Sequence, residues 1–463
     1  MRKFFKSVSL AFIAQIVALL VSAFMSFYVS KFITVEAYGY YQLFLFCTTY
    51  IGILQFGVSE GNYLESGGKT FNQLDHLDLR NQFISTSLVQ AALLILAYLG
   101  INIFVTNPDK YMVFVFVIIS CVINLWTSFF GLQLQAVNQT EKNSIATIVG
   151  KILTLVFFII AAFLKNDSFI LYTIIYIAGW AISGLIVTFY ARKILAVKGK
   201  YEFNLLKHKK TLTAGNSLLY SSLISSFIVG INRIYIDNML GIEAFGRVSM
   251  ALSFCNLFIL FAIQIGMVMF PNIMNLPEIT KEKIYRALSV ILPYLTPAVI
   301  IIYFPLGYLL EQWLPNYVQS IHWILLFVPY MVYEIKNQLL YYTYLKAMRQ
   351  EKYMFRVNIF AFVLCAIINL IVILLTKNIE YMFIVINIVM ITKTLMLEKK
   401  ISDTIDKKIH HICLLEAVIC LVSMAMMYYR SDLLAILICV VLYLAFLAVQ
   451  KKQGMLATIR YLT

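Results

Sequence analysis

Long apolar runs alternate with short polar segments from one end of the chain to the other. The runs are about 20 residues long, the length of α-helix that crosses the roughly 30 Å hydrocarbon core of a membrane. We therefore predict an all-α polytopic membrane protein with about 14 transmembrane helices. The predicted spans are Ser7–Ile33, Tyr41–Tyr63, Gln82–Phe104, Tyr111–Gln135, Ser144–Leu164, Ser168–Ala191, Gly215–Leu240, Ala244–Phe270, Ala287–Leu310, Val318–Leu345, Phe355–Thr376, Ile379–Met396, His410–Tyr428 and Leu433–Val449.

Two short sequence patterns occur twice, at the same points of the helix pattern. The first is Ile33–Gly39, which returns about 207 residues later as Leu240–Gly246. The second is Leu134–Lys142, which returns about 211 residues later as Leu345–Lys352. The matched offsets predict that one six-helix unit was duplicated. Because six spans separate the copies, both have the same orientation, as in parallel repeats around a central cavity.

A basic linker, Arg192–Thr211, joins the sixth and seventh predicted spans and marks the predicted boundary between the halves. We expect an N-terminal six-helix bundle at residues 1–195, a cytoplasmic linker at 196–213, a second six-helix bundle at 214–400, and two accessory helices with a cytoplasmic tail at 401–463. The accessory helices have no counterpart in either repeat, so the sequence assigns them no role.

Composition and charge agree with a membrane location. The 463 residues are 62% hydrophobic and 13% charged, with a mean hydropathy of +0.85, and no soluble domain of this length can bury that much apolar surface. Most Lys and Arg residues lie in the termini and in the loops on the same side, whereas the opposite loops carry only Lys110, Lys165, Lys377 and Arg430. The positive-inside rule therefore predicts cytoplasmic termini. The cations form no stripe, which argues against nucleic-acid binding despite the net charge of +15.

Enzyme motifs are missing from the sequence. It has no Gly-rich phosphate loop that ends in Lys-Ser/Thr, no metal-binding pair of His on a helix and no Gly-x-Ser-x-Gly elbow. All seven cysteines lie in apolar spans, where we interpret them as small buried hydrophobic residues. We predict no catalytic residue, no metal and no cofactor. The short loops also argue against a membrane glycosyltransferase or polymerase, because such enzymes usually carry a large catalytic loop.

Charged residues inside the spans are the candidates for function, because each costs several kcal/mol at the bilayer centre unless it faces a wet cavity or a partner. Lys151 lies about two turns into the fifth span. Arg233 and Asp237 lie on one face of the seventh span, and Glu334 and Lys336 lie on different faces of the tenth. For Arg233, an ion pair with Asp237 and ligand binding are equally good interpretations. For Lys151 and Lys336, the distance from the interface favours a cavity role.

Four further charges complete the set. For Lys31, Arg247 and Lys393, near span ends, we favour side chains that extend to the membrane interface. We expect Glu416, in the thirteenth span, to tether a neighbouring helix. The deeper charges lean positive, which suits an anionic head group such as a diphosphate. The predicted head-group residues are Arg233, Lys336, Lys151, Lys31 and Arg247, and the predicted charge partners or coupling residues are Asp237, Glu334 and Glu416.

The runs Thr34–Tyr41, Leu218–Ser222, Ile231–Tyr235 and Gly241–Gly246 resemble the bacterial polysaccharide flippases, which export O-antigen and capsule units on a lipid carrier. These proteins are the polysaccharide transporter branch of the multidrug/oligosaccharidyl-lipid/polysaccharide exporter superfamily. The resemblance implies two six-helix bundles around a central cavity that opens alternately to each side of the bacterial cytoplasmic membrane. It also implies transfer of an undecaprenyl-diphosphate-linked oligosaccharide, such as a lipopolysaccharide or capsule repeat unit, from the inner to the outer leaflet.

The same resemblance implies that basic cavity residues contact the diphosphate or acidic sugars. It implies membrane lipids, the lipid-linked oligosaccharide and the polysaccharide polymerase with its chain-length machinery as partners. Asn232 departs from the family pattern, which often has Asp before Arg, so ion coupling at this position is in doubt. Two rivals of the same superfamily stay open. A cation-coupled multidrug exporter would favour acidic cavity residues, and a lipid II flippase would share the fold.

The predicted orientation can be tested by cysteine accessibility. A cysteine at Lys110 should react with a membrane-impermeant thiol reagent added outside intact cells, and a cysteine at Lys198 should react only after the cells are opened. The reverse pattern would overturn the orientation derived from the positive-inside rule.

Overall fold

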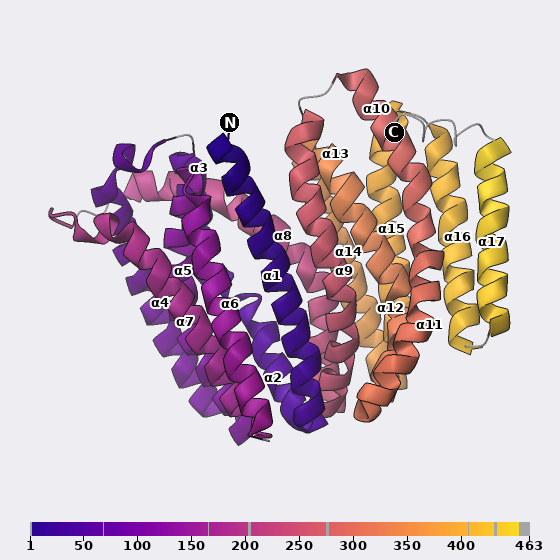
Figure 1. The fold of residues 1–463 in the computed structure, drawn as a ribbon, viewed down its shortest axis with the longest axis horizontal. Helices are drawn as coiled ribbons and strands as arrows, with labels where there is room; N and C mark the ends of the chain where they lie inside the picture. Colours follow the sequence, from indigo (N-terminus) through magenta and orange to yellow (C-terminus); the bar gives the residue numbers. More distant parts are fainter. Residues whose placement is uncertain are drawn as a thin grey trace. The chain divides into compact units, whose positions relative to one another are not determined.

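The computed structural model describes residues 2–67, 69–164, 166–201, 205–274, 277–405, 407–429 and 433–452, and every regular element in these ranges is helical (Figure 1). The chain forms two compact units, Met1–Leu223 and Ile224–Thr463, so the division falls within helix α8 (Leu205–Leu240). The predicted all-helical fold is confirmed.

The elements of the first unit before α8 are α1 (Arg2–Phe32), α2 (Val35–Thr48), η1 (Ile51–Gln55), α3 (Val58–Ser66), η2 (Phe71–Gln73), α4 (His76–Phe104), α5 (Pro108–Ala136), α6 (Thr140–Phe163) and α7 (Phe169–Ala196). The elements of the second unit after α8 are α9 (Ile242–Met274), α10 (Glu278–Ile291), η3 (Leu292–Tyr294), α11 (Leu295–Trp313), η4 (Pro315–Tyr317), α12 (Val318–Lys336), the π-helix η5 (Asn337–Tyr341), α13 (Tyr342–Ala347), α14 (Glu351–Thr376), α15 (Ile379–Ile405), α16 (Lys407–Tyr429) and α17 (Leu433–Lys452).

The described residues include 11 helices that are long and apolar enough to cross a membrane, or up to 12 if the bent pair Val35–Gln55 and Val58–Ser66 is one span. The two other predicted spans, Ser7–Ile33 and Gly215–Leu240, lie along α1 and α8. Large apolar side chains such as Leu185, 70% exposed, cover the outside of these helices. Such a surface is stable only against lipid, so the chain is a multi-pass membrane protein.

Both copies of the second sequence pattern fold into the same turn. Asn138, between α5 and α6, and Arg349, between α13 and α14, have left-handed backbones with φ of 60° and 55°. The following amides, of Gln139 and Gln350, each donate to the carbonyl five residues earlier at 2.8 Å. This bond closes the C-terminus of a helix and reverses the chain. The repeated sequence therefore encodes a repeated helix–turn–helix corner.

Both copies of the first pattern also join two consecutive helices, although their backbones differ. Thr34 caps α2 by accepting a hydrogen bond from the amide of Ala37 at 3.1 Å, and Gly241, with φ of 89°, precedes α9. Four residues into each junction lies an aromatic side chain, Tyr38 or Phe245, that is fully buried. The duplicated pattern thus places one buried ring at the start of the second helix of each unit.

The second predicted span, Tyr41–Tyr63, is not one continuous helix, which corrects the sequence interpretation. Phe56 and Gly57 both have left-handed backbones, and the chain bends by 62° between η1 and α3. A right-handed helix cannot continue through two such residues. At this bend the backbone of Gly57 packs against that of Gly215 in α8. The contact is so close that a Cβ on Gly215 would lie 1.8 Å from the Gly57 carbonyl oxygen. Glycine at both positions is what permits this close crossing.

An asparagine from α15 repairs a break in α12. Pro329 has no N–H, and its ring disturbs the helix bond that would join the amide of Tyr330 to the carbonyl of Leu326. The amide of Tyr330 donates to Asn387 Oδ1 at 2.9 Å, and Asn387 Nδ2 donates to the Leu326 carbonyl at 2.7 Å. The Asn387 side chain therefore supplies a hydrogen-bond partner to both backbone groups at a depth where water is excluded.

Asn387→Leu should destabilise the protein, because it leaves one buried N–H and one buried C=O unpaired at roughly 1–3 kcal/mol each. Thermal unfolding in detergent measures the loss. In a Pro329→Ala background the helix can form its own bond, so the same substitution should cost much less. An equal cost in both backgrounds would contradict the bridging role.

Candidate functional site

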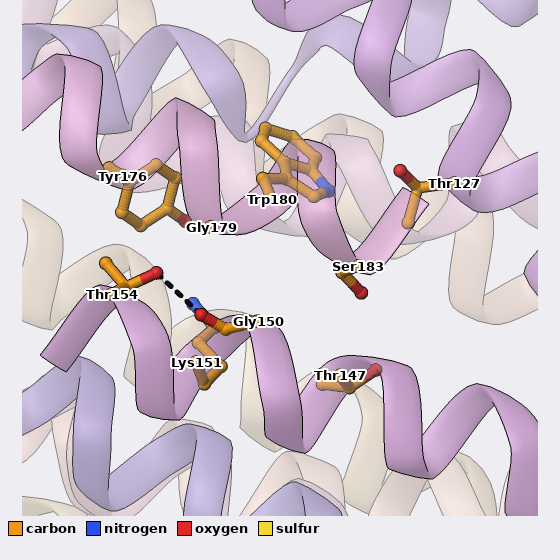
Figure 2. A pocket seen from close by; sticks show the side chains of 9 residues that line it. All are labelled: Thr127, Thr147, Gly150, Lys151, Thr154, Tyr176, Gly179, Trp180 and Ser183. Carbon is orange, nitrogen blue, oxygen red and sulfur yellow. Dashed lines mark hydrogen bonds between the residues drawn. The ribbon is translucent and has the colours of Figure 1, made fainter. Parts of the chain in front are cut away.

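A pocket of about 230 Å³ lies inside the first unit, between α5, α6 and α7 (Figure 2). On α6 its residues follow the spacing i, i+3, i+4, i+7, and on α7 they do the same, so each helix contributes one face. Figure 2 shows these two faces opposite each other, with Thr127 of α5 at one end. The lining residues are Thr127, Thr147, Gly150, Lys151, Thr154, Tyr176, Gly179, Trp180 and Ser183.

Two glycines bring α6 and α7 into backbone contact beside the pocket. A Cβ on Gly150 would lie 2.6 Å from the carbonyl oxygen of Gly179, and a Cβ on Gly179 would lie 1.8 Å from Thr154 Oγ1. Thr154 in turn donates from Oγ1 to the Gly150 carbonyl at 2.8 Å. Close crossings of this kind are a common way to pack helices in membranes. This crossing fixes the positions of the side chains on either side of it.

Lys151 is the one charged residue among the nine that line the pocket. It is the twelfth of the 24 residues of α6 and therefore lies at the middle of a membrane-spanning helix. Its Nζ donates to Ser22 Oγ of α1 at 3.2 Å and lies 4.9 Å from the ring centroid of Tyr176. These contacts orient the ammonium but supply no negative charge. The pocket is consequently electropositive.

Lys336 lies in the predicted span, but the structure pairs it with an acidic residue of another helix. Its Nζ lies 2.7 Å from Glu416 Oε2, and both side chains are buried, with 3% and 0% exposed. Tyr333 also donates to this carboxylate, at 2.7 Å. A head-group role for Lys336 does not fit this geometry, because the ammonium is neutralised and closed off. Glu416 tethers α16 to α12, so the first accessory helix is part of the packed unit.

A second buried ion pair joins α15 to α12. Lys393 Nζ lies 3.3 Å from Glu334 Oε2, with side chains that are 0% and 8% exposed. The same carboxylate group accepts from Gln338 Nε2 at 2.7 Å, from within the π-helix. Lys393 therefore does not extend to the membrane interface, contrary to the sequence interpretation. Glu334 and Lys336, two residues apart, bind different helices, as their predicted opposite faces require.

The remaining predicted residues lie outside the pocket. Arg233 Nη2 donates to Ser249 Oγ at 2.6 Å, and its guanidinium lies 4.6 Å from the ring centroid of Phe245. Arg247 Nη1 donates to the carbonyl of Asn316 at 2.8 Å. Arg233, Arg247 and Asp237 belong to the second unit, and Lys31, exposed near the end of α1, does not line the pocket in the first. Lys151 is thus the one predicted residue that the structure places there.

Asn232, the departure from the family pattern, belongs to a neutral pair. Its Oδ1 accepts from Asn369 Nδ2 of α14 at 2.7 Å, and its Nδ2 donates to the carbonyl of Ile228 at 2.8 Å. Both asparagines are buried. The amide pair joins α8 to α14 without any charge.

Sequence reasoning missed most of the pocket. It identified Lys151 as a deep charge but not the hydroxyl and aromatic side chains around it. A signal was present, since Thr147, Lys151 and Thr154 share one helical face, as do Tyr176, Trp180 and Ser183. Neither helical face, taken alone, indicates a binding site. Only the crossing of α6 and α7 shows that the two faces form one site.

Comparison with solved structures identifies proteins with the same fold. A lipid II flippase MurJ in an inward closed conformation matches with a TM-score of 0.66 and 15% identity, over 97% of this chain and 99% of that one. An inward-facing multidrug resistance MATE family transporter of the MOP superfamily matches with a TM-score of 0.58 and 12% identity, over 84% and 98%. A MOP superfamily transporter from Pyrococcus furiosus, described by the reverse polarity of its binding pocket, matches with a TM-score of 0.54 and 11% identity, over 86% and 96%.

No family model and no curated protein sequence matches the chain. At 11–15% identity the three structures show the fold alone. The fold expected from the sequence resemblance is therefore present.

Removing one member of the Lys336–Glu416 pair should be far more harmful than removing both. Glu416→Leu leaves a buried ammonium without its carboxylate and should destabilise the protein by about 3–5 kcal/mol. The double variant Lys336→Met/Glu416→Leu should regain most of that loss. Thermal unfolding in detergent compares them, with Glu351→Leu on the exposed start of α14 as the control. A single variant as stable as the parent protein would contradict the buried pair.

Proposed function

We propose that the chain is a flippase that moves a lipid-linked, negatively charged saccharide from the cytoplasmic to the outer leaflet of a bacterial cytoplasmic membrane. The unneutralised ammonium of Lys151, at the midpoint of a spanning helix, is the observation that carries this proposal. The expected carrier is undecaprenyl diphosphate bearing an O-antigen, capsule or related repeat unit. The shared fold with a lipid II flippase supports a lipid-linked substrate.

The charge balance of the interior explains why Lys151 stands apart. A lysine at a helix centre costs about 2.5–3.5 kcal/mol on insertion scales. Lys336 is paired with Glu416 and Lys393 with Glu334, and these ion pairs offset that cost. Among the residues that the structure describes, the partners of Lys151 are a hydroxyl and an aromatic ring. A ligand that brings its own negative charge would supply the missing partner, and such a ligand would then be held at membrane depth.

In this mechanism the protein provides a polar route across the membrane for the charged part of the substrate. The negatively charged saccharide enters from the cytoplasmic side and binds at Lys151, while the lipid tail stays in the bilayer. Access then alternates to the other side and the saccharide leaves. The low polarity around Lys151 strengthens its attraction for the charged saccharide without any covalent step. The protein acts as a carrier in this account, not as an enzyme.

The rival function of a cation-coupled drug exporter fits the charges less well. It would need a free carboxylate to hold the cation or its coupling ion. Two of the three predicted coupling residues, Glu334 and Glu416, are paired with lysines, and Asn232 is neutral. A lipid II flippase shares the fold and is the second candidate function.

Proteoliposomes test the proposal directly. A fluorescent acidic saccharide on a polyprenyl diphosphate is reconstituted with the protein, and dithionite added outside bleaches the outer leaflet. The parent protein should raise the bleached fraction from about one half toward completeness. Lys151→Gln should slow flipping about tenfold or more, because a charge-assisted hydrogen bond contributes about 1.5–3 kcal/mol.

Lys142→Gln is the matched control, because Lys142 lies on the same helix, outside the pocket, and donates to Gln139 Oε1 at 2.8 Å. It should flip at the parent rate. Flipping at the parent rate by Lys151→Gln would remove the site from the proposal, and no flipping by the parent protein would remove the function.

A further inference from the structure

We infer that the Lys151 pocket binds one saccharide ring that carries a single negative charge, such as a uronic acid, and that it does not hold the diphosphate of the carrier. This inference rests on the proposed function and names the part of the substrate that the site recognises. Three properties of the pocket lead to it: its charge count, its hydrogen-bonding groups and its size.

The charge count favours one carboxylate over a diphosphate. Lys151 supplies a single ammonium, and none of the other eight lining residues is a cation. After its bond to Ser22 Oγ, the ammonium retains two N–H donors, enough for one carboxylate group. A diphosphate carries more charge and more acceptor oxygens, and it is typically bound by several Lys or Arg side chains.

The three threonine hydroxyls of the pocket favour a ligand that donates hydrogen bonds. The side chains of Thr127, Thr147 and Thr154 each donate to the backbone carbonyl four residues earlier in their own helix, at 2.7, 3.0 and 2.8 Å. A hydroxyl has one proton, so each oxygen can now only accept. Sugar hydroxyls can donate to these oxygens, whereas an ionised diphosphate has no proton to give. The pocket therefore has acceptors for a sugar and one cation for its acid group.

Aromatic side chains and size complete the match. Tyr176 and Trp180 lie one turn apart on α7, with ring centroids 6.2 Å apart at an interplanar angle of 78°. Their apolar surface suits the C–H face of a sugar ring. The volume of about 230 Å³ is below the 300–1,000 Å³ usual for drug-sized ligands. One ring fits such a space and an oligosaccharide does not, so the rest of the glycan must lie outside.

Saturation-transfer NMR on the full chain in detergent tests the inference without any transport. The probes are methyl glucuronide, methyl glucoside and inorganic pyrophosphate. We expect binding of the glucuronide, with an affinity about tenfold higher than that of the uncharged glucoside. Lys151→Gln should abolish this preference. Binding of the glucoside as tight as that of the glucuronide, or Lys151-dependent binding of pyrophosphate alone, would overturn the inference.

A pair of Thr→Val variants tests the hydroxyl argument. Thr147→Val keeps the shape of the side chain and removes an acceptor oxygen, so it should weaken glucuronide binding about threefold to tenfold. Thr173→Val is the matched control, because Thr173 donates to the Phe169 carbonyl at 2.9 Å on α7 but does not line the pocket. Equal effects of the two substitutions would contradict recognition by the pocket oxygens.

The liposome assay separates this inference from the proposed function. Polyprenyl diphosphates that bear an acidic or a neutral sugar are compared, and free methyl glucuronide is added as a competitor. Faster flipping of the acidic lipid, inhibited by the glucuronide, supports the pocket as a site for lipid-linked glycan. Equal flipping of both lipids without inhibition refutes the inference and leaves the function standing. Absence of flipping for both lipids refutes the function.

Discussion

A charge inside a membrane must find an opposite charge, water or a ligand, and this constraint organises the interior of the protein. In the second unit it is met by two ion pairs, in which Lys336 binds Glu416 and Lys393 binds Glu334. In the first unit Lys151 has polar and aromatic partners but no acid in its pocket. The two units thus differ in how their buried lysines are neutralised: the described ion pairs neutralise these two lysines in one unit, and the other unit keeps an electropositive pocket. This difference is why we place the ligand in the first unit.

The absence of water inside the membrane also constrains the backbone, whose polar groups must find partners within the protein. Helices approach closely where glycines meet, at Gly150 with Gly179 and at Gly57 with Gly215. Where proline breaks α12, the amide of Asn387 supplies the two missing bonds. These devices stabilise the bends and crossings from which the pocket and the ion pairs are built. The accessory helix α16 belongs to this framework, because Glu416 is the partner that Lys336 needs.

The sequence predicted what depends on local pattern. Apolar length identified the helices, and two repeated motifs identified helix junctions that occur in both units. It did not predict which charges pair, because Lys336 and Glu416 lie 80 residues apart and no local rule brings α16 against α12. For the same reason Lys393 was expected at the membrane interface. The bend at Phe56 and Gly57 was missed because Tyr41–Tyr63 has the length of one spanning helix. The pocket was missed because its two faces come from separate helices.

The central claim is that Lys151 is kept without an acid so that a ligand can supply one. A cryo-electron microscopy map of the protein with a bound polyprenyl-diphosphate glycan that contains a uronic acid tests it most directly. The account predicts density for one sugar ring against Trp180, with its carboxylate within hydrogen-bonding distance of Lys151 Nζ. A glycan bound elsewhere, with the pocket empty or filled by lipid, would contradict it.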